Sequence, residues 1–271
     1  MSLIRTKKES LFKKSLGKKM NKRGQLTIFI IVAIIIVVII LILLYPRIKS
    51  AVSGPSPVDS IKKCAEDATK QALAKLELQG GTLTPENYIL YQDNKIEYSC
   101  YTNEYYKPCV MQKPFLKQDI EKEVIGAIEP KVKECFNSLK SQLESRGSYV
   151  SVGEIKVDAS LIPNSMLINI NAPTVIKKQT AVSFNQFKVN VKTPLYDLVM
   201  LASSISNYEA RYGDSDTLTF MLYYPDIRIE KKVQSEGSTI YILTNKNSNE
   251  KFMFAARSIA WPPGYLGGKT R

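Results

Sequence analysis

The chain has 271 residues, of which 38 are Lys or Arg and 25 are Asp or Glu, so its formal charge is +13. It contains no histidine, which excludes Ser-His-Asp and Cys-His nucleophile systems, His-ligated zinc and the commonest general base. Nine basic residues and one acid fall within residues 1–24, a local charge of +8. The basic excess therefore belongs mainly to the N-terminus and not to a nucleic-acid surface. We predict no nucleic-acid partner, no cofactor and no enzymatic activity.

An apolar run follows the basic segment directly. Residues 26–45 hold no charge, Gly or Pro, and 17 of these 20 residues are Leu, Ile, Val or Phe. A helix of that length rises about 30 Å, which matches the core of a bilayer. We predict a transmembrane helix over residues 25–46, in contact with membrane lipid. The positive-inside rule would then place the basic leader, 1–24, in the cytoplasm and the C-terminal domain outside it, in a single-pass protein of the cell membrane.

The junction between the basic leader and the apolar run carries a more specific signal. Arg23, Gly24 and Gln25 stand immediately before the run, and this arrangement resembles the class III signal peptide of type IV pilins, especially archaeal ones. The resemblance covers about residues 21–45. It implies a prepilin peptidase that cuts after Gly24, and pilin-like subunits as partners. Phe29 stands where bacterial major pilins usually have Glu, and the alternative is an anchor that is never cut.

The remainder of the chain predicts an α+β fold, with helices and a largely antiparallel sheet in segregated stretches. A linker is expected over 47–57, a helical, Cys-containing subdomain over 58–147, a sheet-rich α+β subdomain over 148–257 and a tail over 258–271. In the helical subdomain, apolar residues recur at helical spacing from Ile61 to Leu76, where Gly80 and Gly81 should end the helix. A second helix is expected over 115–145, kinked or split at Pro130.

Residues 148–257 change to a period-two pattern, which predicts strands. A third helix interrupts them after Thr193 and Pro194, and Gly213 should end it. Its predicted apolar stripe is Leu195, Leu198, Val199, Ala202, Ile205 and Tyr212. The expected strands are 150–152, 155–161, 167–172, 181–191, 218–222, 227–233, 239–243 and 252–256. Asp214 and Asp216 follow the third helix and read as a solvated turn more than as a calcium site.

Four cysteines lie between residues 64 and 135, an even number that favours disulfides in an exported segment. We prefer Cys64–Cys135, which would join two helix stripes, and Cys100–Cys109, which would close a local loop. Three pairings are possible. A four-thiolate zinc site lacks the usual paired spacing and is the weaker reading, and unpaired core thiols remain an alternative. We expect no metal site.

Tyrosines crowd into one short segment. They are Tyr88, Tyr91, Tyr98, Tyr101, Tyr105 and Tyr106. Tyrosine is enriched in recognition surfaces, so the segment is a candidate binding site. The alternative is cross-strand packing within a sheet.

Two functions are consistent with these features. The first is a membrane-anchored surface protein that is pilin-like in export and has a structural or minor-pilin role. The second is an uncleaved, anchored binding or adhesion protein that never polymerises. The sequence identifies no ligand.

Overall fold

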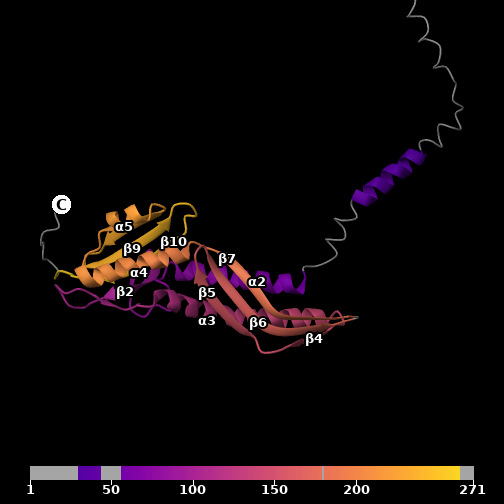
Figure 1. Cartoon of the computed structure of the whole chain (residues 1–271), viewed down its shortest axis with the longest axis horizontal. Coiled ribbons are helices and arrows are strands. Elements are labelled where there is room, and N and C mark those ends of the chain that lie inside the picture. Colours follow the sequence, from indigo (N-terminus) through magenta and orange to yellow (C-terminus); the bar gives the residue numbers. More distant parts are fainter. Residues whose placement is uncertain (1–29, 44–55, 179, 263–271) are drawn as a thin grey trace, which may run out of the picture. The chain divides into compact units, whose positions relative to one another are not determined.

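The computed structural model describes residues 30–43, 56–178 and 180–262 (Figure 1). The chain divides into two units, Met1–Ser56 and Pro57–Arg271. Within the first unit, residues 30–43 are helical and consist only of aliphatic side chains. The second unit is an α+β structure with two sheets, so the predicted α+β class is confirmed.

The predicted transmembrane helix over 25–46 is wrong. Among the described residues, no helix combines the length and the apolar character needed to cross a membrane. Single-pass localisation in the cell membrane, with a cytoplasmic N-terminus and an extracytoplasmic C-terminal domain, depended on that span and is contradicted with it.

Two long antiparallel helices open the second unit. They are α2, Pro57–Leu76, and α3, Leu116–Glu144. Buried residues of α3 recur every four positions from Leu116 to Phe136, which forms one continuous apolar stripe. The first helix ends at Leu76, and the chain turns away at Gly80 and Gly81, whose φ of +76° and +87° lies in a region that favours glycine. Pro130 was predicted to kink or split the second helix; it lies inside a continuous α3, so a split is wrong and a kink stays a prediction.

The helix pair covers one face of a four-stranded antiparallel sheet. Its strands are β4 Tyr149–Val152, β5 Lys156–Ile162, β6 Ser165–Lys177 and β7 Ala181–Lys192. The long strand β6 is central, with β4 and β5 on one side and β7 on the other. Because alternate residues face opposite sides, cross-strand rows such as Val157, Ile170 and Phe187 point to the helices.

A second, mixed sheet carries the remaining strands. They are β1 Tyr88–Tyr91, β2 Asn94–Tyr101, β3 Val110–Met111, β8 Ile227–Val233, β9 Ser238–Asn245 and β10 Lys251–Arg257. The order is β1-β2-β10-β9-β8, with β3 on β2, and only the β2–β10 pair is parallel. Helix α4, Leu195–Tyr212, packs on one face of it (Figure 1). The sheet joins strands from both predicted subdomains, so the boundary at 147/148 separates no compact units.

The segment predicted as a strand over 218–222 is instead a short helix, α5, Thr217–Tyr223. Asp216 caps it: its carboxylate accepts hydrogen bonds from the Leu218 backbone N–H at 3.0 Å and from the Thr219 hydroxyl at 2.6 Å. A capping aspartate satisfies donors at a helix start, and this local bonding outweighed the apolar alternation of the segment. The predicted turn at Asp214 and Asp216 is present.

Replacing Cys64 and Cys135 together by serine should lower the free energy of unfolding by about 4 kcal/mol, because that disulfide closes a loop of sequence separation 71. The matched change at Cys100 and Cys109, with a separation of 9, should cost about 3 kcal/mol on the same chain-entropy argument. Urea unfolding followed by circular dichroism measures both. Equal stability of the first variant and the parent chain, under non-reducing conditions, would contradict the stapling role.

Candidate functional site

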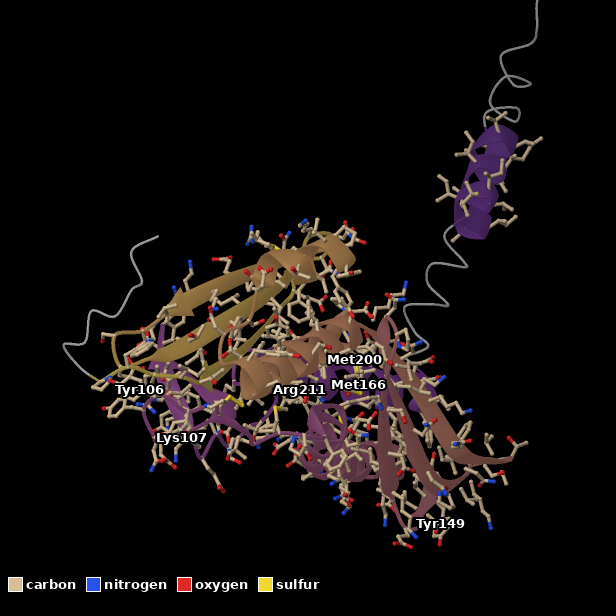
Figure 2. All side chains as sticks on the ribbon, turned by 60° about the vertical axis from the view of Figure 1, so that its left-hand side comes forward. Tyr106, Lys107, Tyr149, Met166, Met200 and Arg211 are labelled. Atoms are coloured by element: carbon tan, nitrogen blue, oxygen red, sulfur yellow. A yellow bond between two sulfur atoms is a disulfide. The ribbon has the colours of Figure 1, made fainter. Side chains whose placement is uncertain are left out.

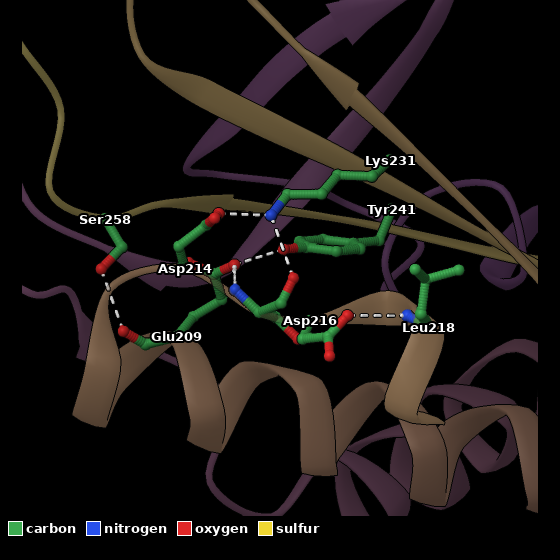
Figure 3. A network of polar contacts seen from close by, with 8 residues as sticks. Glu209, Asp214, Asp216, Leu218, Lys231, Tyr241 and Ser258 are labelled. Carbon is green, nitrogen blue, oxygen red and sulfur yellow. Dashed lines mark hydrogen bonds and ion pairs between the residues drawn. The ribbon is translucent and has the colours of Figure 1, made fainter. Parts of the chain in front are cut away.

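A buried polar network lies between the end of α4 and the second sheet (Figure 3). Its centre is Glu209, which is only 3% exposed. Glu209 lies four residues after Ile205, on the same buried face of α4. One carboxylate oxygen accepts hydrogen bonds from the Tyr241 hydroxyl and, at 2.9 Å, from the Ser215 backbone N–H. Ser258 donates to the backbone carbonyl of Glu209 at 3.0 Å. The network thus ties α4 to β9 and to the chain after β10.

A lysine extends this network toward solvent. Lys231, on β8, forms an ion pair with Asp214 and donates to the backbone carbonyl of Ser215 at 3.1 Å. The lysine side chain is 19% exposed and the Asp214 side chain 66% exposed. The ion pair is therefore at the rim, while Glu209 and Tyr241 are enclosed behind it.

Burial dominates the electrostatics of the enclosed pair. Desolvation raises the pKa of Glu209 above the ordinary value for a glutamate, against the opposing effects of the Tyr241 hydrogen bond and the Lys231 charge. Desolvation also raises the pKa of Tyr241, and the neighbouring Glu209 raises it further. Tyr241 is therefore a neutral hydrogen-bond donor at physiological pH. The arrangement holds α4, β8 and β9 together, and its tyrosine is fully buried.

The apolar pattern of the sequence did not predict this network. Tyr212 was the predicted last residue of the α4 stripe, but its side chain is 63% exposed, and the buried residue at that end of the helix is Glu209. The available signal was the spacing: a charged residue four positions after Ile205 falls on the apolar face of the helix. A charge at such a position requires a partner, which here comes from β9, more than 30 residues later.

A second perturbed carboxyl group follows α2. Glu77 lies in the turn that continues α2, where its N–H donates to the Leu73 carbonyl at 2.9 Å and its own carbonyl accepts from the Met253 N–H of β10 at 2.8 Å. Burial, and then the charge of Glu250, raise the pKa of Glu77 to about 8. Glu250 itself accepts from the Thr193 hydroxyl at 2.8 Å, just before α4 begins. Two carboxyl groups thus approach each other where the α2 end, β10 and α4 meet.

The cysteines are paired as predicted. Cys64 joins Cys135 across the two helices with Cα atoms 6.5 Å apart, and Cys100 joins Cys109 with Cα atoms 5.4 Å apart. Both separations suit disulfide geometry. Beside the first disulfide, an open groove of about 390 Å³ runs between α2 and α3. It is lined by Ser60, Ile61, Cys64, Lys131, Glu134, Cys135, Ser138, Leu139 and Gln142.

The tyrosine segment does not form one surface. Tyr98 is buried, bonds Ser238 through its hydroxyl at 2.7 Å and packs against Tyr101 with ring centroids 4.8 Å apart. Tyr91 and Tyr101 are partly buried against the same small core. These three tyrosines therefore match the alternative prediction, packing between strands of a sheet. Tyr88, Tyr105 and Tyr106 are exposed.

Each exposed tyrosine has a separate neighbour. The Lys95 ammonium lies 4.7 Å from the ring centroid of Tyr88 on β1. Arg257 lies 5.5 Å from the Tyr105 ring, and Tyr106 packs edge-on against Trp261 at 4.9 Å. Figure 2 shows Tyr106 beside Lys107 at one end of the unit and Tyr149 at the other. A binding role for these exposed rings stays a prediction.

The predicted processing residues Arg23, Gly24 and Gln25 lie outside the described residues. In the described ranges, no group of three or more His, Cys, Asp or Glu side chains is arranged to hold a metal ion. Comparison of the chain with protein-family models, with curated proteins and with solved structures found no match.

Replacing Tyr241 by phenylalanine should destabilise the fold by about 1–3 kcal/mol, because it removes a hydrogen bond from a buried carboxylate and keeps the ring. Replacing Glu209 by glutamine as well should cost less than the two single changes added together, since the side chains are directly bonded. Chemical unfolding of the four chains in a double-mutant cycle measures the coupling. Strict additivity would show that the bond contributes nothing to stability.

The raised pKa of Glu77 should make the free energy of unfolding depend on pH. Its pKa is near 4.5 in the unfolded chain and about 8 in the folded one, so the folded state binds more protons between these values. Stability contributed by this group is therefore complete below pH 4.5 and lost as the pH rises to 8. Glu77→Gln should reduce the loss between pH 5 and 9 by roughly 2–4 kcal/mol. The control Glu86→Gln, for an exposed glutamate in the following loop, should leave the profile unchanged; equal slopes for the parent and Glu77→Gln would contradict the assignment.

Proposed function

We propose that this chain is a pilin-like structural subunit whose leader is cut after Gly24 and whose apolar N-terminal helix packs against pilin-like partners. The observation that carries the proposal is the helix at 30–43. Its Ile, Val and Leu side chains are between 46% and 67% exposed, on every side of the helix. A helix that is apolar all round needs a covering surface. A bundle of like helices, as the pilin resemblance implies, would supply it.

The second unit supports a structural role more than a catalytic one. Its most perturbed acidic pair, Glu209 and Tyr241, is enclosed and fully engaged in hydrogen bonds. All four cysteines are in disulfides, which leaves no thiol nucleophile. Both disulfides suit a protein that works in oxidising surroundings. Phe29, in place of the glutamate common in bacterial major pilins, favours a minor component over the main repeating subunit.

The second candidate is a binding protein that keeps its leader and never polymerises. The exposed aromatic side chains of Tyr105 and Tyr106 favour it, because exposed tyrosine gives a large contact area at a low entropic cost. The two candidates differ at one chemical bond, the peptide between Gly24 and Gln25.

Protein isolated from its native cells should begin at Gln25, as determined by N-terminal sequencing or intact-mass spectrometry. Gly24→Val should abolish this cut, because the junction glycine is the residue that the peptidase family resemblance requires. Gly17→Val provides the matched control: it changes a glycine in the same leader, seven residues away, and should leave cleavage intact.

Retention of residues 1–24 in the native protein would remove the processing argument and favour the second candidate. Loss of cleavage in both glycine variants would show a general requirement for the leader and not a junction motif. If cleavage occurs as expected, fractionation of surface filaments should find this chain as a minor band; its presence as the main repeating unit would contradict the minor role.

A further inference from the structure

The two disulfides differ in how far they are buried. Cys100 is 0% exposed and Cys109 4%, and both belong to the main hydrophobic core. Cys64 and Cys135 are only partly buried, and each lies within a helix, α2 and α3 respectively. Both bonds belong to the same chain, so the buried disulfide is an internal standard for the reactivity of the accessible one.

The surroundings of Cys100–Cys109 explain why it is shielded. Cys100 pairs with Met111 of β3 on one side and with Ala256 of β10 on the other. The Cys109 N–H donates to the Ser258 hydroxyl at 3.0 Å, and α4 packs against both β2 and β3. A reductant can therefore reach this disulfide only after part of the second sheet opens.

The groove between α2 and α3 gives the other disulfide a different exposure. Its volume is about 390 Å³, and all nine of its lining residues, Cys64 and Cys135 included, belong to one of the two helices. Ile61 and Leu139 are the apolar residues beside the cysteines. Sites for small molecules occupy roughly 300–1,000 Å³, so the groove has room for a small thiol next to the sulfur atoms.

The charges that line the groove do not oppose a thiolate. Lys131 and Glu134 are the two charged lining residues, and they form an ion pair with each other at 3.0 Å. The reactive species in thiol–disulfide exchange is a thiolate anion, which an uncompensated carboxylate at the groove would repel. Because Lys131 neutralises Glu134, this repulsion is absent from the groove lining.

We propose that the Cys64–Cys135 disulfide is a site of thiol–disulfide exchange with an external dithiol, whereas Cys100–Cys109 is a structural bond. A thiolate of the dithiol attacks one Sγ atom, the S–S bond breaks, and its electron pair leaves on the other Sγ, which takes up a proton. The second thiol of the reductant then attacks the mixed disulfide and releases the second cysteine. The protein bond is reduced by two electrons, and the dithiol is oxidised to a disulfide.

Reduction at this site removes a specific constraint. The four cysteines of the chain form two bonds, and Cys100–Cys109 spans only nine positions, so Cys64–Cys135 is the covalent cross-link of α2 to the rest of the second unit. Without it α2 is still held by its buried side chains, among them Ile61, Ala65 and Leu73. Exchange therefore loosens the helix pair without dismantling it. This site goes beyond the proposed function and does not depend on cleavage after Gly24.

Reduction of the folded full-length chain tests the proposal. The chain is incubated with dithiothreitol, samples are quenched with N-ethylmaleimide at intervals, and peptide mapping measures the alkylation of each cysteine. The initial rate at Cys64 and Cys135 should be at least tenfold that at Cys100 and Cys109 and proportional to the dithiol concentration, with unchanged circular dichroism. Equal rates at the two disulfides, a rate independent of dithiol concentration, or no reduction of Cys64–Cys135 would each overturn the proposal.

A matched pair of variants tests the groove as the route of access. Ser138→Trp places a large ring at an exposed lining position and should slow the exchange at Cys64–Cys135 by about threefold or more. Asn137→Trp adds the same ring at the preceding exposed position of α3, outside the lining, and should leave the rate unchanged. Equal rates in Ser138→Trp and the parent chain would overturn the proposal.

The source of the dithiol is identified by the same measurement. Thioredoxin and dithiothreitol are compared at equal dithiol concentration, each as the sole reductant. A faster reaction with thioredoxin identifies a protein dithiol as the partner, and a faster reaction with dithiothreitol identifies a low-mass dithiol. Either order supports exchange at Cys64–Cys135, while failure of both reagents rejects it and leaves the proposed function untouched.

Discussion

The parallel pairing of β2 with β10 holds the second unit together. It joins residues near 100 to residues near 256, and no other pair of neighbouring strands in either sheet of the described chain is parallel. Side-chain hydrogen bonds on both strands reinforce this pairing. Ser99 bonds Ser206 of α4 at 2.6 Å and the carbonyl of Ala255 at 3.2 Å, while the Arg257 guanidinium donates to the Thr102 carbonyl. Without this pairing, β1, β2 and β3 would be separated from the sheet formed by β8, β9 and β10.

Buried and half-buried glutamates share one role around this pair of strands, because each accepts a hydrogen bond from a backbone N–H elsewhere in the second unit. Glu123 of α3 accepts from the Leu83 N–H at 3.1 Å, and Glu121 accepts from the Leu161 N–H at 2.7 Å. Glu97 does the same for Glu86 at 2.9 Å, and Glu209 for Ser215. A carboxylate that accepts from a backbone N–H makes a strong, charge-assisted bond. These bonds fix the loops that position α3, α5 and β5.

The proposed function follows from the exposed apolar surface of the helix at 30–43. The helix at 30–43 is aliphatic on all sides and accepts any apolar cover, so it can drive association without selecting a geometry. The disulfide between Cys64 and Cys135 joins α2 to α3 in the second unit.

The sequence by itself determined the local elements. Periodicity and caps located α2, α3, α4 and most strands, and cysteine placement on the expected helix stripe gave the Cys64–Cys135 pair. Tertiary structure decided what depends on distant residues. Glu209 is tolerated on a buried stripe because Tyr241 reaches it from β9. The pairing of β2 with β10, between residues 156 or 157 positions apart, could not be predicted from the local pattern, since strand pairing depends on which apolar faces meet in space.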